Sequence, residues 1–287
     1  MASKGFKILD ELRYSTTKLT VYKKAGRVGL GTGFFFDMKY TDGKHCLLLV
    51  TNKHMAEDWH KLTFRINKAD AKNNPILGDA VQITLTNTPT QKCIEHPDVD
   101  LCVFEVWPSI KSVWDSGVKL CYRSLHEGLL PQNYTINYVG PIEDIIMIGY
   151  PDGMADEKNN LPIVRRGITA TDFKVDYNGK KEFLIDASIF KGSSGSPVLI
   201  CNLGSYTNPD GHLILGDRCF FLGVQYRGEF SKYQQNIYVK NAEGEYVNTP
   251  DVLSANFNDL GFCVKSECLL FFKEEIKKQG WTLFRIQ

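Results

Sequence analysis

The sequence predicts an all-β protein that ends in a single helix. Short β-prone runs, alternating or wholly apolar, recur along the 287 residues with turn-forming residues between them, and helical periodicity is scarce. This combination is typical of a β-barrel or β-sandwich. The apolar share of 43% and the charged share of 23% are those of a globular chain that can bury its own core.

The first predicted strand, residues 17–23, alternates polar and β-branched or aromatic side chains. A glycine-rich stretch at 29–33 then leads into three consecutive phenylalanines. A turn at Asp42 and Gly43 precedes the apolar run 47–50, which predicts a buried strand. Further strands are predicted by the same criteria at residues 62–66, 81–85, 101–106, 145–148, 162–168, 183–185, 197–201, 219–226 and 261–264.

One segment near the C-terminus has helical spacing. Apolar residues recur at intervals of three and four over 269–279, and Gly280 suits the end of a helix. A shorter helix is predicted at 109–117. Polar stretches predict loops at 67–78, 152–160, 202–217 and 229–258, the last long enough to be functional or mobile. We expect two units, residues 1–130 and 131–287.

Composition narrows the classes of partner. A formal net charge of +1 creates no overall field for nucleic acid or a membrane surface. The N-terminus lacks the apolar stretch of a signal peptide, and no apolar run is long enough to span a bilayer. We therefore expect a cytoplasmic protein whose eight cysteines are free thiols. Because no C-x-x-C pair occurs, we expect no metal site and no cofactor.

The stretch Gly-Ser-Ser-Gly-Ser-Pro at 192–197 contains a candidate nucleophile. A serine between glycines can be presented on a tight turn beside backbone N–H groups, which is what acyl transfer requires. Ser194 is the candidate. The alternative is an ordinary surface loop, since Gly, Ser and Pro are also common in turns.

A serine nucleophile needs a base, and that base needs a group to orient it. Of six histidines, His54 follows directly on an apolar strand, where a side chain can face a cleft. Asp100 stands at the start of the buried run 101–104, which would shield its carboxylate from water. Asp98 competes, because it lies two residues back and so on the same face of an extended segment. We prefer Asp100, which is closer to the apolar run.

Together these segments resemble the chymotrypsin-like, or trypsin-fold, serine proteases, and most closely their bacterial HtrA-like branch. The order His, Asp, Ser along the chain is that of the family. The resemblance extends from about residue 17 to 265 and is carried by segments at 31–35 (Gly-Thr-Gly-Phe-Phe), 50–54 (Val-Thr-Asn-Lys-His), 100–104 (Asp-Leu-Cys-Val-Phe), 148–151 (Ile-Gly-Tyr-Pro), 164–170, 186–197, 222–224 and 260–264.

The resemblance implies two antiparallel six-stranded β-barrels, with His and Asp on the first and Ser on the second. It implies that Ser194 is the nucleophile, His54 the general base and Asp100 the orienting carboxylate. The backbone N–H groups of Gly192 and Ser194 would form the oxyanion hole. The substrate pocket would be lined by Ser188, Ile189, Phe190, Val224, Gln225 and Tyr226. Because Ser188 stands where trypsin has a carboxylate, we expect an uncharged residue before the cut.

The sequence departs from trypsin at Ser193, where trypsin has an aspartate that pairs with a newly cut N-terminus. We also expect no PDZ domain, which HtrA-like proteases often carry. We expect a protein or peptide substrate and an activating protein partner, as for a bacterial effector protease. The alternative function is a catalytically silent protein-binding module on the same fold.

Overall fold

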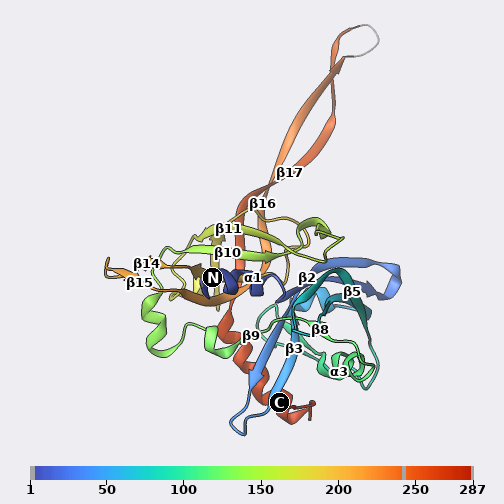
Figure 1. Cartoon of the computed structure of the whole chain (residues 1–287). Coiled ribbons are helices and arrows are strands. Elements are labelled where there is room, and N and C mark those ends of the chain that lie inside the picture. Colours follow the sequence, from blue (N-terminus) through green and yellow to red (C-terminus); the bar gives the residue numbers. More distant parts are fainter. Residues whose placement is uncertain (1–3, 241–243, 286–287) are drawn as a thin grey trace.

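The first half of the chain forms an open sheet, in a computed structural model that describes residues 4–240 and 244–285 (Figure 1). Seven strands follow the order β5-β4-β1-β2-β3-β7-β6, while β8 pairs with β4 and β9 runs parallel beside β2. The strands are β1 (Thr16–Lys23), β2 (Val28–Lys39), β3 (His45–Thr51), β4 (Trp59–Ala69), β5 (Pro75–Thr86), β6 (Cys93–Glu95), β7 (Cys102–Glu105), β8 (Leu120–Cys121) and β9 (Leu125–His126).

The second half forms a closed antiparallel barrel in the order β10-β11-β12-β17-β16-β13. Its strands are β10 (Asp144–Gly149), β11 (Ile163–Thr169), β12 (Glu182–Asp186), β13 (Pro197–Asn202), β16 (Arg218–Lys240) and β17 (Tyr246–Lys265). The all-β class and one six-stranded barrel are therefore confirmed.

A second closed barrel is not present among the described residues, because the edge strands β5 and β6 of the first sheet do not pair with each other. β6 has only three residues and pairs with β7, so it offers little backbone to close a ring. The strands of the open sheet end at residue 126 and those of the barrel begin at residue 144. The division at residue 130 lies between them and stays a prediction.

Four α-helices are described: α1 (Lys4–Leu12), α2 (Lys53–Ala56), α3 (Trp107–Asp115) and α4 (Phe271–Lys278). The predicted helix at 109–117 corresponds to α3. The one at 269–279 corresponds to α4 and the 3₁₀ turn η6 (Ser266–Leu270) before it.

The single-turn α2 is too short to create a helical period, so the sequence pattern missed it. The other 3₁₀ turns are η1 (Lys24–Gly26), η2 (Glu127–Leu129), η3 (Asn133–Tyr138), η4 (Pro151–Gly153) and η5 (Tyr177–Gly179).

The prediction of a loop at 229–258 is wrong. Strands β16 and β17 leave the barrel and continue as a two-stranded antiparallel ribbon that extends far from the rest of the molecule (Figure 1). Backbone pairing between the two strands overrides the polar composition that predicted a loop. The predicted loop at 202–217 likewise contains a small hairpin, formed by β14 (Ser205–Thr207) and β15 (Leu213–Leu215).

The open sheet, the barrel and α4 share one hydrophobic core. The ring of Phe221 from the barrel lies 5.3 Å from that of Phe34 and 6.3 Å from that of Phe36, both in β2. Phe272 and Ile276 of α4 are buried in the same cluster. This packing brings the open sheet against the barrel wall formed by β10, β13 and β16. Across the described residues, no helix is both long and apolar enough to cross a membrane.

Candidate active site

His54 and Asp100 lie in contact, although 46 residues separate them in the sequence. β3 ends at Thr51, and the single turn α2 then places His54 beside the start of β7. Nδ1 of His54 lies 2.6 Å from Oδ2 of Asp100, and the backbone N–H of His54 donates to Oδ1 at 2.9 Å. Asn52 donates to the carbonyl oxygen of Asp100 at 2.8 Å, which anchors the backbone there. Both oxygens of one carboxylate thus orient one histidine.

The environment of Asp100 keeps its carboxyl group ionised. Burial alone would raise the pKa, but the hydrogen bond from His54, the charge of His54 and further backbone hydrogen bonds together lower the pKa below its usual range. Asp98, the competing carboxylate, occupies a different position: its backbone N–H donates to Nδ1 of His96. The contact to His54 is made by Asp100.

Ser194 lies in the loop between β12 and β13, and the two glycines beside it are needed there. Gly192 and Gly195 have φ angles of +79° and +88°, in the left-handed region that favours glycine. A Cβ atom on Gly195 would also lie 1.9 Å from the carbonyl oxygen of Thr32. The backbone angle and the close approach of β2 therefore both require glycine at this position.

The loop between β12 and β13 that carries Ser194 is called the serine loop below. Thr32 joins it to the open sheet, a role that the sequence did not reveal. Its backbone N–H donates to the carbonyl oxygen of Ser194 at 2.8 Å, and its hydroxyl donates to that of Gly192 at 3.1 Å. Thr51, at the end of β3, donates in turn to the carbonyl oxygen of Thr32 at 2.8 Å. The only signal in the sequence was the run of small residues at 31–33. These bonds connect the loop to the strand that leads to His54.

The hydroxyl of Ser194 does not point at His54 in this structure. It donates to the backbone carbonyl oxygen of Tyr226 at 3.2 Å, and no hydrogen bond joins these two described side chains, Ser194 and His54. The structure therefore brings together His54 and Asp100, with Ser194 turned toward β16. A rotation about the Cα–Cβ bond of Ser194 changes the direction of its hydroxyl without moving the backbone.

The backbone before Ser194 has an orientation relevant to an oxyanion hole. The N–H of Asp152 donates to the carbonyl oxygen of Lys191 at 2.5 Å. In a trans peptide the N–H points opposite to the C=O, so the N–H of Gly192 points away from Asp152. Within the described residues, neither this N–H nor that of Ser194 donates a hydrogen bond to a protein group. Both donors are free for a ligand.

The residues predicted to line a substrate pocket differ in exposure. Ser188 and Phe190 are exposed and Tyr226 is partly buried. Ile189, Val224 and Gln225 are buried, and the first two belong to the hydrophobic cores.

A cavity of about 480 Å³ lies beside His54. Its lining is mostly acidic and consists of Lys53, His54, Glu57, Glu95, Asp98, Val99 and Asp100. Within residues 4–240 and 244–285, no three His, Cys, Asp or Glu side chains are grouped so that they could hold a metal ion.

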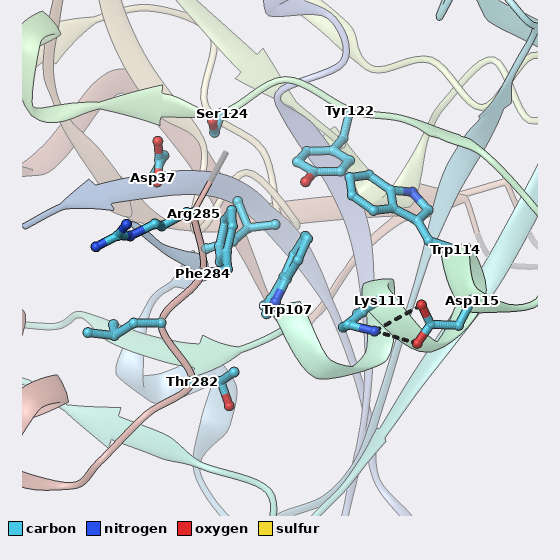
Figure 2. A pocket seen from close by; sticks show the side chains of 12 residues that line it. Asp37, Trp107, Lys111, Trp114, Asp115, Tyr122, Ser124, Thr282, Phe284 and Arg285 are labelled. Atoms are coloured by element: carbon cyan, nitrogen blue, oxygen red, sulfur yellow. Dashed lines mark hydrogen bonds and ion pairs between the residues drawn. The ribbon is translucent and has the colours of Figure 1, made fainter. Parts of the chain in front are cut away.

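A separate cavity of about 690 Å³ shares no lining residue with the one beside His54. The C-terminal tail forms one wall, where the ring of Phe284 stacks on Trp107 at 3.9 Å (Figure 2). Phe284 also exchanges backbone hydrogen bonds with His45. Lys111 and Asp115 on α3 pair with each other (Figure 2).

A model of the trypsin-like peptidase domain matches residues 31–204, more than half of the chain. No curated protein sequence matches the chain. Similar solved structures include an HtrA-type protease, AlgW, with a tripeptide, at 14% identity and a TM-score of 0.46, where the match covers 96% of this chain and 64% of the other. The chain thus spans less than two thirds of the length of that protein.

Two further solved structures are similar. A serine endoprotease from Yersinia pestis has 16% identity and a TM-score of 0.45, with 98% of this chain and 69% of the other covered. The Rv3671c protease from M. tuberculosis, in its active form, has 14% identity and a TM-score of 0.44, with 99% and 88% covered.

Proposed function

The chain belongs to the trypsin-like peptidase family, and we propose that it is a serine endopeptidase that cleaves peptide bonds through an acyl-enzyme. The observation that carries the proposal is the contact of 2.6 Å between His54 and Asp100. A carboxylate on Nδ1 leaves the other ring nitrogen free to accept a proton and stabilises the imidazolium that results.

In the proposed reaction, the hydroxyl of Ser194 turns from Tyr226 toward His54 when substrate binds. Ser194 attacks the scissile carbonyl carbon while Nε2 of His54 takes its proton, and His54 then gives that proton to the leaving amine. The free N–H groups of Gly192 and Ser194 stabilise the oxyanion. Water then attacks the acyl-enzyme by the same route and releases the acid.

The proposed substrate is a peptide with an uncharged side chain before the cut. Ser188 supplies a hydroxyl where a carboxylate would select arginine or lysine. A panel of fluorogenic peptides that differ only at this position tests the proposal, and a strong preference for arginine would contradict it.

We also propose that a protein partner activates the enzyme. The hydrogen bond from Ser194 to the carbonyl oxygen of Tyr226 supports this, because it competes with a bond to His54 and so slows the isolated chain without preventing its reaction. If the purified chain alone degrades unfolded casein briskly, the partner is not required.

The experiment that tests the function is labelling with a fluorophosphonate probe. The wild-type chain should be labelled at Ser194, as mapped by mass spectrometry, and Ser194→Ala should not be labelled. Ser205→Ala, which changes an exposed serine on β14, is the matched control and should label normally. A folded wild-type chain that resists the probe would favour the alternative, a catalytically silent protein-binding module.

A further inference from the structure

A partly buried arginine, Arg165, stands behind the serine loop, at a position to which the proposed reaction assigns no role. Arg165 lies on β11 directly opposite Met147 of β10, so both side chains are on the same face of the barrel wall. Met147 is fully buried in the barrel core among Phe183, Val198 and Leu222. Arg165 therefore directs a cation toward an apolar interior.

The guanidinium of Arg165 holds the serine loop at two points. Its Nη1 donates to the carbonyl oxygen of Ser188 and to Oγ of Ser193, each at 2.8 Å. The same Oγ accepts from the backbone N–H of Phe190 at 3.3 Å, and the N–H of Ser193 donates to the carbonyl oxygen of Phe190 at 3.1 Å. One side chain thus binds both ends of the segment 188–193, and Gly192 lies inside that segment.

The remaining donors of Arg165 have no partner. Its Nε and Nη2 are shielded from solvent and make no hydrogen bond, and no ion pair in the described part of the chain includes this residue. Burial lowers the pKa of the guanidinium to about 10, against the opposing charge of Asp152. An unpaired buried cation costs stability. Stability therefore does not explain why an arginine occupies this position.

We propose that Arg165 is a positioning residue that holds the segment 188–193 in the conformation in which the N–H of Gly192 is free for the oxyanion. The inference rests on the proposed peptidase function. Arg165 acts through Ser193, the residue before the nucleophile, whose hydroxyl accepts the guanidinium's hydrogen bond. Without this bond the peptide between Lys191 and Gly192 loses part of its support and can turn its N–H away.

The decisive variant is Arg165→Met, because methionine fills the apolar site without a charge. We expect kcat to fall about 10²–10³-fold, as on loss of one oxyanion donor, with little change in KM. Binding of a peptide boronate, which mimics the tetrahedral intermediate, should weaken by a similar factor. The unfolding temperature should stay the same or rise, since a buried unpaired charge is removed.

Two further variants separate positioning from a merely structural role. Arg165→Lys keeps a cation with several donors and should retain most of the activity, and Arg165→Ala should recover activity when guanidinium chloride is added at millimolar concentration. Arg166→Met is the matched control, because the neighbouring side chain is 78% exposed and points away from the loop. It should leave kcat, KM and the unfolding temperature unchanged.

A folded Arg165→Met variant with wild-type kcat would overturn the proposal. So would parallel losses of stability and activity that neither lysine nor guanidinium restores. Amide hydrogen exchange of the peptide that contains residues 188–196 gives a readout that does not need activity, and Arg165→Met should exchange faster there than Arg166→Met. If the wild-type chain is not labelled at Ser194, the proposed function fails. Equal hydrogen exchange in Arg165→Met and Arg166→Met would instead refute the positioning role of Arg165.

Discussion

At the scale of single residues, Asp100 orients His54 with both carboxylate oxygens, one on the ring and one on the backbone N–H. Asp100→Asn keeps the shape and places an amide where the second oxygen stood. The amide N–H group facing Nδ1 favours the wrong tautomer of His54, so we expect kcat to fall about 10⁴-fold. The measurement is kcat on a fluorogenic peptide, with the Asp98→Asn variant as control. Equal kcat in wild type and Asp100→Asn would remove Asp100 from the mechanism.

The lowered pKa of Asp100 also predicts how stability depends on pH. Because the folded pKa lies below the unfolded value of about 3.9, the unfolded chain binds more protons between the two values, and stability rises with pH there. The contribution is fully present above about pH 4 and is lost as pH falls through the folded pKa. Urea unfolding should therefore separate wild type from Asp100→Asn more at pH 7 than at pH 3. A separation that grows toward low pH would mean that the pKa is raised instead.

At the scale of elements, a buried ion pair anchors the start of β10 to the start of β16. Arg218 donates to both oxygens of Glu143, and also to the carbonyl oxygen of Tyr138 and the side chain of Asn202. The side chains of the pair are only 5% and 9% exposed. The pair therefore has few routes to water if one partner is removed.

Glu143→Gln should destabilise the protein by about 3–5 kcal/mol, because it leaves the charge of Arg218 buried without its counter-ion. Chemical unfolding measures the loss. Asp144→Asn is a matched control on the next residue, since its pair with Arg166 is mostly exposed and should contribute about 0–1 kcal/mol. Equal losses from the two variants would show that burial of the Glu143 pair has no energetic consequence.

The ribbon of β16 and β17 shows what a local pattern cannot decide. The segment 229–258 is polar, and polar composition predicts a loop. Within the barrel, β16 and β17 already pair, beginning with Gly223 opposite Lys265. This pairing brings the two polar stretches side by side, and they then pair with each other as the ribbon. The predicted helix at 269–279, by contrast, was visible because helical period is a local property.

At the scale of the whole molecule, the two halves share one hydrophobic cluster, in addition to the core that each half forms within itself. Phe221 of the barrel contacts Phe34 and Phe36 of the open sheet and is fully buried. The serine loop is also bonded to Thr32 of the sheet. Because each half completes the other, we expect them to unfold together.

Phe221→Ala should lower stability by about 3–5 kcal/mol, as for a large ring removed from a packed core. The single transition should nevertheless persist. Unfolding in urea should be followed by tryptophan fluorescence and by far-UV circular dichroism, and the two signals should change over the same range of urea concentration. Three tryptophans report on the first half: Trp59, Trp107 and Trp114. Phe220→Ala, on the neighbouring and partly buried side chain, should cost less. Separate transitions for the two probes would show that the halves are independent.

The amino-acid sequence alone predicts the features that depend on near neighbours in the chain. It determined the all-β class, most strands, the helix before Gly280, the glycines that bracket Ser194, and the order of His54, Asp100 and Ser194 that indicated the family. These features follow from side-chain period, backbone angle and short motifs.

The packing of the whole chain sets which distant groups meet. It left the first sheet open, paired the polar segment 229–258 into a ribbon, and bonded Thr32 to the serine loop. It turned the hydroxyl of Ser194 toward Tyr226 and placed Arg165 behind Ser193. Hydrogen bonds and burial between residues far apart in sequence depend on how the two halves pack, and no local pattern encodes that packing.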